Sequence, residues 1–519
     1  MKSAAIFFSS AAVCWSQPII SAVEDAASNI PLKTFGSPPS FANASIAQGS
    51  MFVVKGNGLG PASIVVANSY PLQTTLAGTS IQIVVSGTAT NAIMYYTQAQ
   101  QVAAILPSST PVGAGHISVY YNGQYNSFDI YVVQNNVAMY TVDESGGGDA
   151  VITLADNSLV MPNNAPNPGD TVVFLANGLG PVSDDESLPA TGGDMTSVPL
   201  EVFIGGQPAK VLYRGRNTCC VSLDQINVQI PQNVSTGCVV SVTMRIGTLV
   251  SNTTTMPIRS SGRVCTPTNP AISQADVQHL MSQKSLNIGI ISLERSIPRS
   301  GVDVLTPSFK KVSGLPSLVL DELVDVPAPG SCTVTYNFVG NNWYLKLPNA
   351  NLDAGSIALS GPTGVIAIPN NGGRFLDPGP YTVTAAGGAD IGAFQMVERV
   401  PPAFTWNYLN NSTIETFDRT QGITVTWSGA NSSSYVTISG YGNDASSTTF
   451  FSCTARVSDG SFTVPPLVLQ SLPADGTIMG AVEIEAVSIQ APFAAKGLDF
   501  GIAWAAEYDA SGLGTVVFQ

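Results

Sequence analysis

Two matching segments, spaced 120 residues apart, constrain the fold of this chain more than any other feature of its sequence. Residues 49–61 and 169–181 both run from a glycine through a polar residue and an apolar stretch to Asn-Gly-Leu-Gly-Pro. A repeating unit of that length is a whole domain. The sequence therefore predicts a modular chain in which similar domains follow one another.

The similarity continues beyond these segments after a single change of offset. Gln101 matches Gln225 and Gly123 matches Gly247, each pair being 124 residues apart. Chance matches would scatter in offset, so the two modules differ by one net insertion before Gln225. The interval that holds this insertion includes the loop 182–199, which we expect to project from the domain.

The composition favours strands over helices. Only 10% of the 519 residues are charged, and 49 Gly and 35 Pro separate short β-branched and apolar runs. That mixture is typical of β-strands joined by tight turns, so we predict an all-β protein built from β-sandwich domains. The net charge of −14 and the lack of a Lys/Arg cluster argue against nucleic acid as a partner.

Local patterns predict individual elements. Asn122-Gly123 between two Tyr-rich runs predicts a two-residue hairpin, because both turn positions need positive φ. Trp427 alternates with Ile423 and Val425, which places it on their face as a core residue rather than a sugar-stacking one.

The first residues resemble a secretory signal peptide. Lys2 precedes the apolar stretch 4–15, and the small residue Ser16 follows as the cleavage position. No later segment has about 20 uninterrupted apolar residues, the length that a bilayer requires. We expect an exported protein, secreted or at the cell surface, with no membrane span after the signal peptide.

Domain boundaries follow from prolines and turn residues. Pro267 and Pro270 mark a boundary, and the capping-box pattern from Ser273 to Asp276 predicts one short helix near 273–283. The expected units are the signal peptide 1–16, β-sandwiches 36–140 and 141–262, a β-rich domain 271–400 and a β-sandwich 401–519.

An even number of cysteines remains once Cys14 leaves with the signal peptide. In an exported chain, disulfides are the default expectation. A zinc site is the rival, but there is no Cys-x-x-Cys pair and the only histidines are His116 and His279, so we expect no metal. The disulfide candidates are Cys219, Cys220, Cys238, Cys265, Cys332 and Cys453.

The pairing follows from strand geometry. Neighbouring residues on a strand face opposite ways, so Cys219 and Cys220 should seek different partners. We predict that Cys238 bonds to one of them and Cys265 to the other, which leaves Cys332 with Cys453.

The second module carries a resemblance to a known group. Residues 202–209 and 224–231, followed by Gly237, resemble the uncharacterised tandem β-sandwich modules of exported acidobacterial proteins. Those modules are similar to IPT/TIG domains, and the cysteines resemble those of one branch of the group. The resemblance covers 141–265 best and the first module less well. It implies immunoglobulin-like (IPT/TIG-like) sandwiches and export, and it supplies no catalytic residues.

No motif for a cofactor or a reaction emerges. The two Gly-rich segments lack a following Lys-Ser/Thr and an amphipathic helix, so we interpret them as turns rather than phosphate loops. Acidic runs at 184–186 and 321–325 lack the alternating spacing of a calcium loop. We interpret them as solvated charge, with weak calcium binding by the loop 182–199 as the rival hypothesis. Neither Gly-x-Ser-x-Gly nor His-Glu-x-x-His occurs.

These observations favour a non-catalytic surface or extracellular protein that serves in adhesion, recognition or spacing. Its partner would be an unknown protein or glycan, contacted by loops or strand edges. A carbohydrate-binding accessory is one alternative, and a hydrolase with scattered carboxylates is another. Coplanar exposed rings would support the accessory, the candidates being Tyr95, Tyr96, Tyr120, Tyr121 and Trp343.

Overall fold

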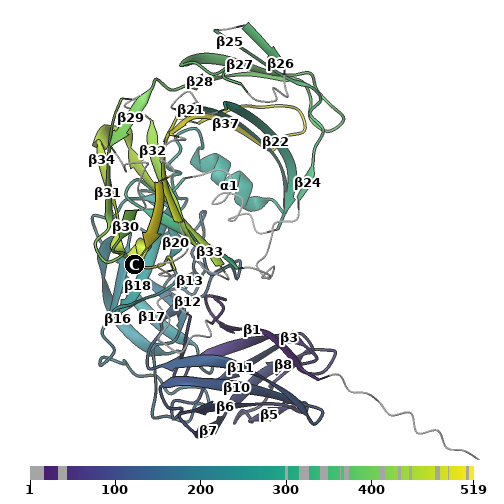
Figure 1. Ribbon diagram of the computed structural model, residues 1–519, viewed down its shortest axis with the longest axis vertical. Coiled ribbons are helices and arrows are strands. Elements are labelled where there is room, and N and C mark those ends of the chain that lie inside the picture. Colours follow the sequence, from purple (N-terminus) through teal and green to yellow (C-terminus); the bar gives the residue numbers. More distant parts are fainter. Residues whose placement is uncertain are drawn as a thin grey trace, which may run out of the picture.

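The fold is all-β, as predicted, with about 52% strand and 4% helix. Figure 1 shows the computed structural model, with the N-terminal sheets at one end and the sheets of residues 285–509 towards the other. The expected signal peptide, 1–16, lies outside the described residues. The structure describes residues 17–32, 44–297, 302–314, 326–338, 349–362, 364–367, 373–407, 415–429, 434–443, 447–473, 480–488, 490–509 and 514–518.

The first module is a sandwich of two sheets around one core. The strand orders are β1-β3-β9-β8-β4 and β2-β11-β10-β6-β5, with β7 beside β6. Phe52, Ile83 and Val119 are among the fully buried residues of its core. The strands are β1 (Ile19–Asp25), β2 (Ile46–Ala47), β3 (Met51–Asn57), β4 (Val65–Val66), β5 (Thr75–Leu76), β6 (Thr79–Val85), β7 (Thr88–Asn91), β8 (Ile93–Thr97), β9 (Gln101–Ile105), β10 (Gly113–Tyr121) and β11 (Gln124–Val133).

The second module repeats this plan. Its strands follow the order β12-β14-β17-β16-β15-β18-β19, with β13 beside β14 and β20 beside β18. The long strand β16 pairs with β15 through residues 207–209 and with β17 through residues 210–216, so it links two halves that enclose one core. The strands are β12 (Ala138–Met139), β13 (Ile152–Thr153), β14 (Thr171–Asn177), β15 (Leu200–Ile204), β16 (Gln207–Arg216), β17 (Asp224–Gln229), β18 (Gly237–Ile246), β19 (Leu249–Val250) and β20 (Thr254–Ile258).

The repeated Asn-Gly-Leu-Gly-Pro motif ends a strand and fills the core in both modules. Leu59 and Leu179 are fully buried, each in the core of its own module. Gly58 and Gly178 precede them with φ of 66° and 90°, a conformation that glycine adopts without a steric cost. The motif is therefore a turn in both copies.

The predicted hairpin is confirmed. Tyr121 pairs with Gln124 across Asn122 and Gly123, whose φ values are 51° and 76°. The matching Gly247 has φ 61° in the turn between β18 and β19, which agrees with the repeat offset of 124 residues.

The predicted short helix is α1 (Gln274–Ser282). Ser273 caps it, and the reciprocal bonds between Ser273 and Asp276 form the expected capping box. Val277 and Leu280 are buried in a cluster that includes side chains of β18 and β21, while His279 is exposed. The helix therefore packs the second module against the sheet that follows.

One large sheet joins the two C-terminal segments that were expected as separate domains, 271–400 and 401–519. Its main order is β23-β33-β32-β35-β37-β21-β22-β24, and β21 lies parallel to β37 from Ile288–Phe500 to Ile297–Asp509. The strands are β21 (Ser285–Ile297), β22 (Val304–Ser313), β23 (Cys332–Phe338), β24 (Asn349–Asn351), β30 (Glu415–Phe417), β32 (Tyr435–Asn443), β33 (Ser447–Arg456), β35 (Gly480–Val487), β36 (Ala491–Pro492), β37 (Phe500–Asp509) and β38 (Gly514–Phe518).

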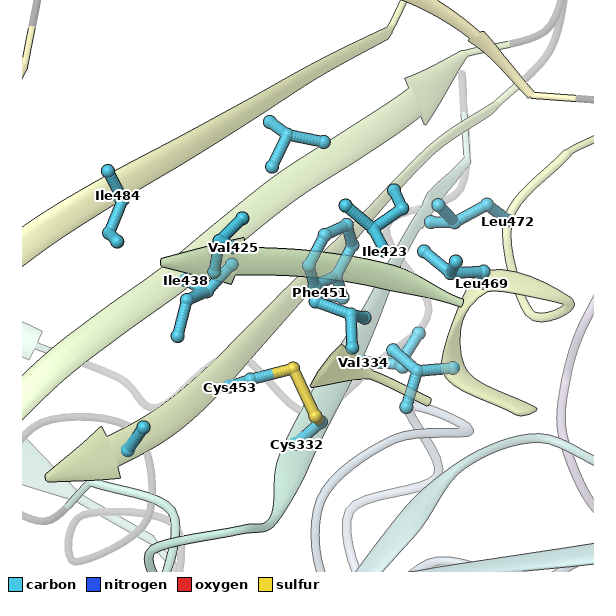
Figure 2. Close-up of a cluster of buried hydrophobic side chains, with 14 of the residues drawn as sticks. Cys332, Val334, Ile423, Val425, Ile438, Phe451, Cys453, Leu469, Leu472 and Ile484 are labelled. Atoms are coloured by element: carbon cyan, nitrogen blue, oxygen red, sulfur yellow. A yellow bond between two sulfur atoms is a disulfide. The ribbon is translucent and has the colours of Figure 1, made fainter. Parts of the chain in front are cut away.

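Two small sheets, the first within residues 357–400 and the second within residues 404–464, pack against this large sheet. Each forms a separate hydrophobic core with it. Figure 2 shows the second core, where Val425 lies beside Ile438 and Phe451. Trp427 belongs to it, as predicted, and its indole Nε1 donates to the carbonyl of Val457 at 2.9 Å. The remaining elements are β25 (Ile357–Gly361), β26 (Gly364–Ala367), β27 (Gly379–Ala385), β28 (Phe394–Val400), β29 (Phe404–Asn407), β31 (Ile423–Gly429), β34 (Ser461–Val464), the 3-10 helix η2 (Val457–Asp459) and α3 (Pro466–Leu469).

Two disulfides lie in the interior. Cys332 bonds to Cys453 across the paired strands β23 and β33, as predicted (Figure 2). Cys238 bonds to Cys265, so the expected pairing of these two cysteines with Cys219 and Cys220 is wrong. Cys238 faces the cluster around α1, where Cys265 also lies, and therefore finds its partner there.

Candidate functional site at the junction of the first two modules

The first two modules are joined by buried polar contacts centred on Asn177. Its side-chain amide donates to Oδ2 of Asp25 at 2.8 Å and to the carbonyl of Met51 at 2.9 Å, and its Oδ1 accepts from the backbone N–H of Met51 at 3.0 Å. Burial raises the pKa of Asp25 to about 6. Because both polar atoms of the Asn177 side chain have partners in the first module, the junction favours one relative orientation of the two modules.

A buried ion pair completes the junction. The Arg216 guanidinium pairs with the carboxylate of Asp224, and both side chains are almost fully buried. Burial raises the pKa of Asp224, while the charge of Arg216 opposes that shift. Arg216 also donates to the carbonyls of Gly49 at 3.0 Å and Gly180 at 2.7 Å. One cation thus connects both modules and the repeated turn.

The loop 182–199 does not project freely, contrary to our expectation. Both carboxylate oxygens of Glu186 accept hydrogen bonds from Ser108, one from its N–H and one from its hydroxyl, each at 2.7 Å. The backbone N–H of Leu72 donates to the carbonyl of Ser187 at 2.8 Å. The first module therefore supplies the partners that fold the loop back onto the junction.

This loop and the junction enclose a cavity of about 320 Å³. The carboxylates that line it are those of Asp184, Asp185, Glu186 and Asp194, and the other lining residues include Gly49, Arg216 and Ser222. Asp194 forms an ion pair with Arg214 at 3.3 Å, and Arg216 is already paired with Asp224. The charge around the cavity is therefore predominantly negative.

Asp185 is ionised at neutral pH. Hydrogen bonds from the hydroxyl and N–H of Ser187, at 2.6 and 3.0 Å, lower the pKa of this carboxyl. The cavity can therefore attract a cation, and Asp185 is unsuited to give up a proton.

A bend between β16 and β17, residues 217–223, borders the cavity. Three residues, 98–100, separate β8 from β9 in the first module, whereas seven separate β16 from β17. The longer connection lies inside the interval where the repeat offset changes. We call residues 217–223 the cysteine bend.

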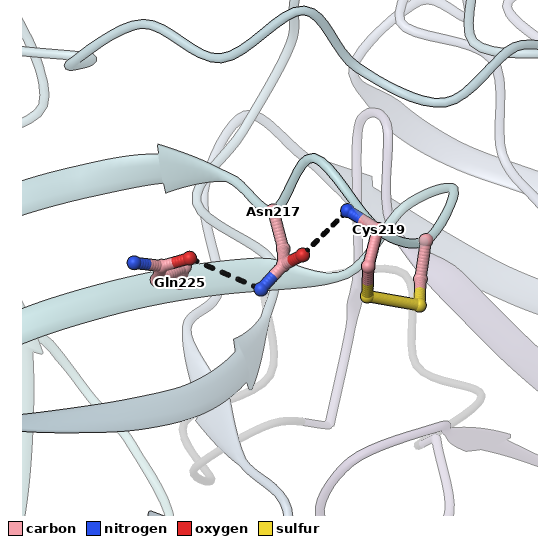
Figure 3. Close-up of a disulfide and its surroundings, with 4 residues drawn as sticks. Asn217, Cys219 and Gln225 are labelled. Carbon is pink, nitrogen blue, oxygen red and sulfur yellow. Dashed lines mark hydrogen bonds between the residues drawn. A yellow bond between two sulfur atoms is a disulfide. The ribbon is translucent and has the colours of Figure 1, made fainter. Parts of the chain in front are cut away.

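The cysteine bend holds a disulfide between adjacent residues, Cys219 and Cys220 (Figure 3). We expected these cysteines on a strand with separate partners, but they lie in a bend, where consecutive side chains can turn towards each other. The N–H of Cys219 donates to Oδ1 of Asn217 at 2.7 Å, and the Asn217 amide donates to Oε1 of Gln225 at 3.0 Å. Cys219 is exposed.

The residues after the disulfide contact the first module. Val221 is buried with Leu72 and Ile105 in a small apolar cluster. The hydroxyl of Ser222 donates to the carbonyl of Gly49 at 2.9 Å, the same carbonyl that Arg216 binds. The cysteine bend is thus part of the junction as well as of the cavity wall.

The remaining site hypotheses have mixed outcomes. Among the described residues, no group of three or more His, Cys, Asp and Glu side chains could hold a metal ion, which gives the calcium hypothesis for the loop 182–199 no support. The acidic run 321–325 and Trp343 lie outside the described residues. Tyr95 and Tyr96 meet at 61°, and Tyr120 stacks on Tyr125 with centroids 5.3 Å apart, so neither pair presents two coplanar rings side by side.

A second cavity, of about 560 Å³, lies between β28 and the loops before β32 and β36. Glu398 lines it, and burial raises the pKa of this carboxyl to about 7. Its Oε1 accepts from the N–H of Arg399 and the hydroxyl of Ser488, each at 3.0 Å, while Oε2 is buried without a hydrogen-bond partner. This lone acid lies away from the acidic cavity.

Sequence reasoning missed the junction. Asn177 belongs to the repeated motif, but its counterpart Asn57 is exposed, so the motif alone does not distinguish a junction residue from a turn residue. The adjacent cysteines and the change of offset are signals that could have located the cysteine bend, but we expected the cysteines on a strand.

Comparisons with known proteins add little. No family model matches the chain, and no curated protein does. Among solved structures, the I9-I11 tandem from titin is 11% identical and covers 68% of this chain and 92% of its own, with a TM-score of 0.14. The S-layer protein rSbsC is 10% identical over 96% and 55% (TM-score 0.18), and invasin, a bacterial integrin-binding protein, is 12% identical over 90% and 77% (TM-score 0.14). Scores this low carry no functional argument. Within the described residues, no helix has the length and apolarity to cross a membrane.

Proposed function

We propose that the protein is an exported, non-catalytic recognition element whose first two modules form a rigid unit that binds a cationic partner at the acidic cavity. The observation that carries this proposal is the arrangement of four carboxylates from one loop around a cavity whose wall also includes the neighbouring module. Loops held on a rigid sandwich are suited to recognition.

The chemistry of the cavity supports a basic partner. Its charge is predominantly negative, because the guanidinium of Arg216 is neutralised by Asp224. The ammonium or guanidinium group of a Lys- or Arg-rich protein segment would complement that field. The volume of about 320 Å³ falls within the range of ligand pockets.

Binding fits these carboxylates better than hydrolysis does. A hydrolase that uses a pair of carboxyl groups needs one protonated acid beside an ionised one. The pKa of Asp185 is lowered, and both oxygens of Glu186 are held by Ser108. The acid with a pKa near 7, Glu398, belongs to the other cavity.

We further propose that the modules belong to the IPT/TIG-like group of exported proteins and that the protein acts outside the cell or on its surface. The tandem β-sandwich fold and the three disulfides among the described residues support this proposal.

The test is the binding of a fluorescein-labelled oligolysine peptide, followed by anisotropy. Asp185→Asn should weaken binding about fivefold, because it removes one charge from the cavity. Asp156→Asn is the matched control: Asp156 accepts from Ser158 at the same 2.6 and 3.0 Å and is also exposed, but it does not line the cavity.

Equal weakening by both variants, or no binding of the peptide, would contradict the cavity as the site. Binding on a glycan array that Asp185→Asn leaves unchanged would favour the carbohydrate-binding accessory instead.

A further inference from the structure

We propose that the Cys219–Cys220 disulfide is a thiol-exchange site and that opening it loosens the contact between the first two modules. This inference goes beyond the recognition role and does not depend on the identity of the ligand.

The three disulfides in the described part of the chain differ in exposure and in the loops that they close. Cys238–Cys265 and Cys332–Cys453 are buried and join residues 27 and 121 positions apart. Cys219–Cys220 joins neighbours, and Cys219 is exposed. A disulfide stabilises a fold chiefly by closing a loop in the unfolded chain, and this one closes almost none. The bond therefore contributes little to folding and is open to attack by external thiols.

The bend that carries this disulfide is connected to the first module on both sides. Arg216 precedes it and Ser222 lies within it, and both donate to the carbonyl of Gly49. Val221 lies between the disulfide and Ser222 and is buried against Leu72 and Ile105. Any change in the path of the bend therefore reaches the junction directly.

The disulfide lies in a bend that also holds a residue with a left-handed backbone conformation. Ser222 has φ of 58°, a left-handed conformation that costs energy for any residue with a side chain. The N–H of Asn217 donates to the carbonyl of Leu223 at 2.7 Å and closes the bend. The disulfide joins Cys219 and Cys220, which lie between these two residues. Once the bond opens, Ser222 can relax towards negative φ, which withdraws its hydroxyl from Gly49.

The exchange needs a thiol as co-reactant, either a low-molecular-weight thiol or a protein dithiol. Its thiolate attacks Sγ of the exposed Cys219, the Sγ–Sγ bond breaks, and Sγ of Cys220 leaves as a thiolate that takes a proton from water. A second thiolate then attacks the mixed disulfide and releases Cys219. The protein gains two electrons and two protons, and the two thiols become one disulfide.

The test is graded reduction of the full chain with dithiothreitol, followed by alkylation and peptide mass mapping. Cys219 and Cys220 should react at least about tenfold faster than the four buried cysteines. After this selective reduction, hydrogen exchange should accelerate at the amides of Met51 and Leu72, which donate to Asn177 and Ser187 across the junction.

The variant Cys219→Ser/Cys220→Ser supplies the control. It should show the faster exchange at Met51 and Leu72 without reductant, and reductant should cause no further change under the same selective conditions. The proposal is overturned if Cys219 and Cys220 react no faster than the buried cysteines, or if both amides keep their protection in the reduced protein or in the variant.

Discussion

Asn177 of the second module donates a hydrogen bond to the Asp25 carboxylate of the first, at 2.8 Å and across 152 residues of sequence. Both side chains are buried, so this contact takes the place of water in the interior of the junction. The junction is therefore built like a domain interior, and its residues should respond to mutation as core polar residues do.

We expect Asn177→Ala to lower the free energy of unfolding by about 2–3 kcal/mol, because it removes the bonds to Met51 and leaves buried Oδ2 of Asp25 without the hydrogen bond that Asn177 donates. Urea unfolding measures the change. Asn57→Ala, at the matching position of the repeat, should cost less than about 0.5 kcal/mol because Asn57 is exposed. Equal losses would mean that the motif, and not the junction, determines the effect.

Arg216→Gln should destabilise the protein more than Asn177→Ala does. We expect the free energy of unfolding to fall by about 3–5 kcal/mol, because the carboxylate of Asp224 stays buried without its cation. Thermal and urea unfolding both report it. Arg214→Gln, which affects a partly exposed ion pair with Asp194, should cost at most about 1 kcal/mol. The double variant Arg216→Met/Asp224→Leu should recover much of the loss, and its failure to do so would indicate a role other than charge pairing.

Glu398 should make the protein less stable as pH rises. Its pKa is about 7 in the folded protein against 4.5 in a model peptide, so the folded state holds the proton more tightly. The contribution of this group to the free energy of unfolding therefore falls by about 3 kcal/mol between pH 4.5 and about pH 7 and then levels off.

The difference in unfolding free energy between wild type and Glu398→Gln isolates this effect. This difference should change by about 3 kcal/mol between pH 4.5 and pH 8, because the wild type loses stability relative to the variant as the pH rises. A difference for Glu398→Gln that is independent of pH would contradict the raised pKa.

The disulfides should rank by the loop that each closes. Replacing both cysteines by alanine should cost about 5 kcal/mol for Cys332–Cys453 and about 3.5 kcal/mol for Cys238–Cys265, given separations of 121 and 27 residues. The Cys219–Cys220 pair should cost less than about 1 kcal/mol. Denaturant unfolding of the three variants tests this order, and a large loss for the last pair would reverse it.

Much of the architecture was predictable from local patterns. The hairpin at Asn122-Gly123, the helix capped by Ser273 and the buried Trp427 each follow from interactions within a few residues or from strand alternation. The repeat predicted two similar sandwiches because it recurs at turn positions that only glycine fills easily.

Long-range partners were not predictable in this way. Nothing near Cys238 in the sequence distinguishes Cys265 from Cys219 as its partner, since the choice depends on which side of the sandwich each faces. The same holds for the bond from Arg216 to the carbonyl of Gly49, which forms only when the two modules dock. The pairing of β21 with β37 also joins segments that local patterns place in separate units.

That parallel pairing sets an order of events during synthesis. The strands of the first two modules find their neighbours within one module, so each module can fold soon after it has been synthesised. Residues 285–297 must instead wait for residues 500–509, which arrive more than 200 residues later. A chain truncated before β37 would keep its N-terminal half and leave an edge of β21 open to aggregation.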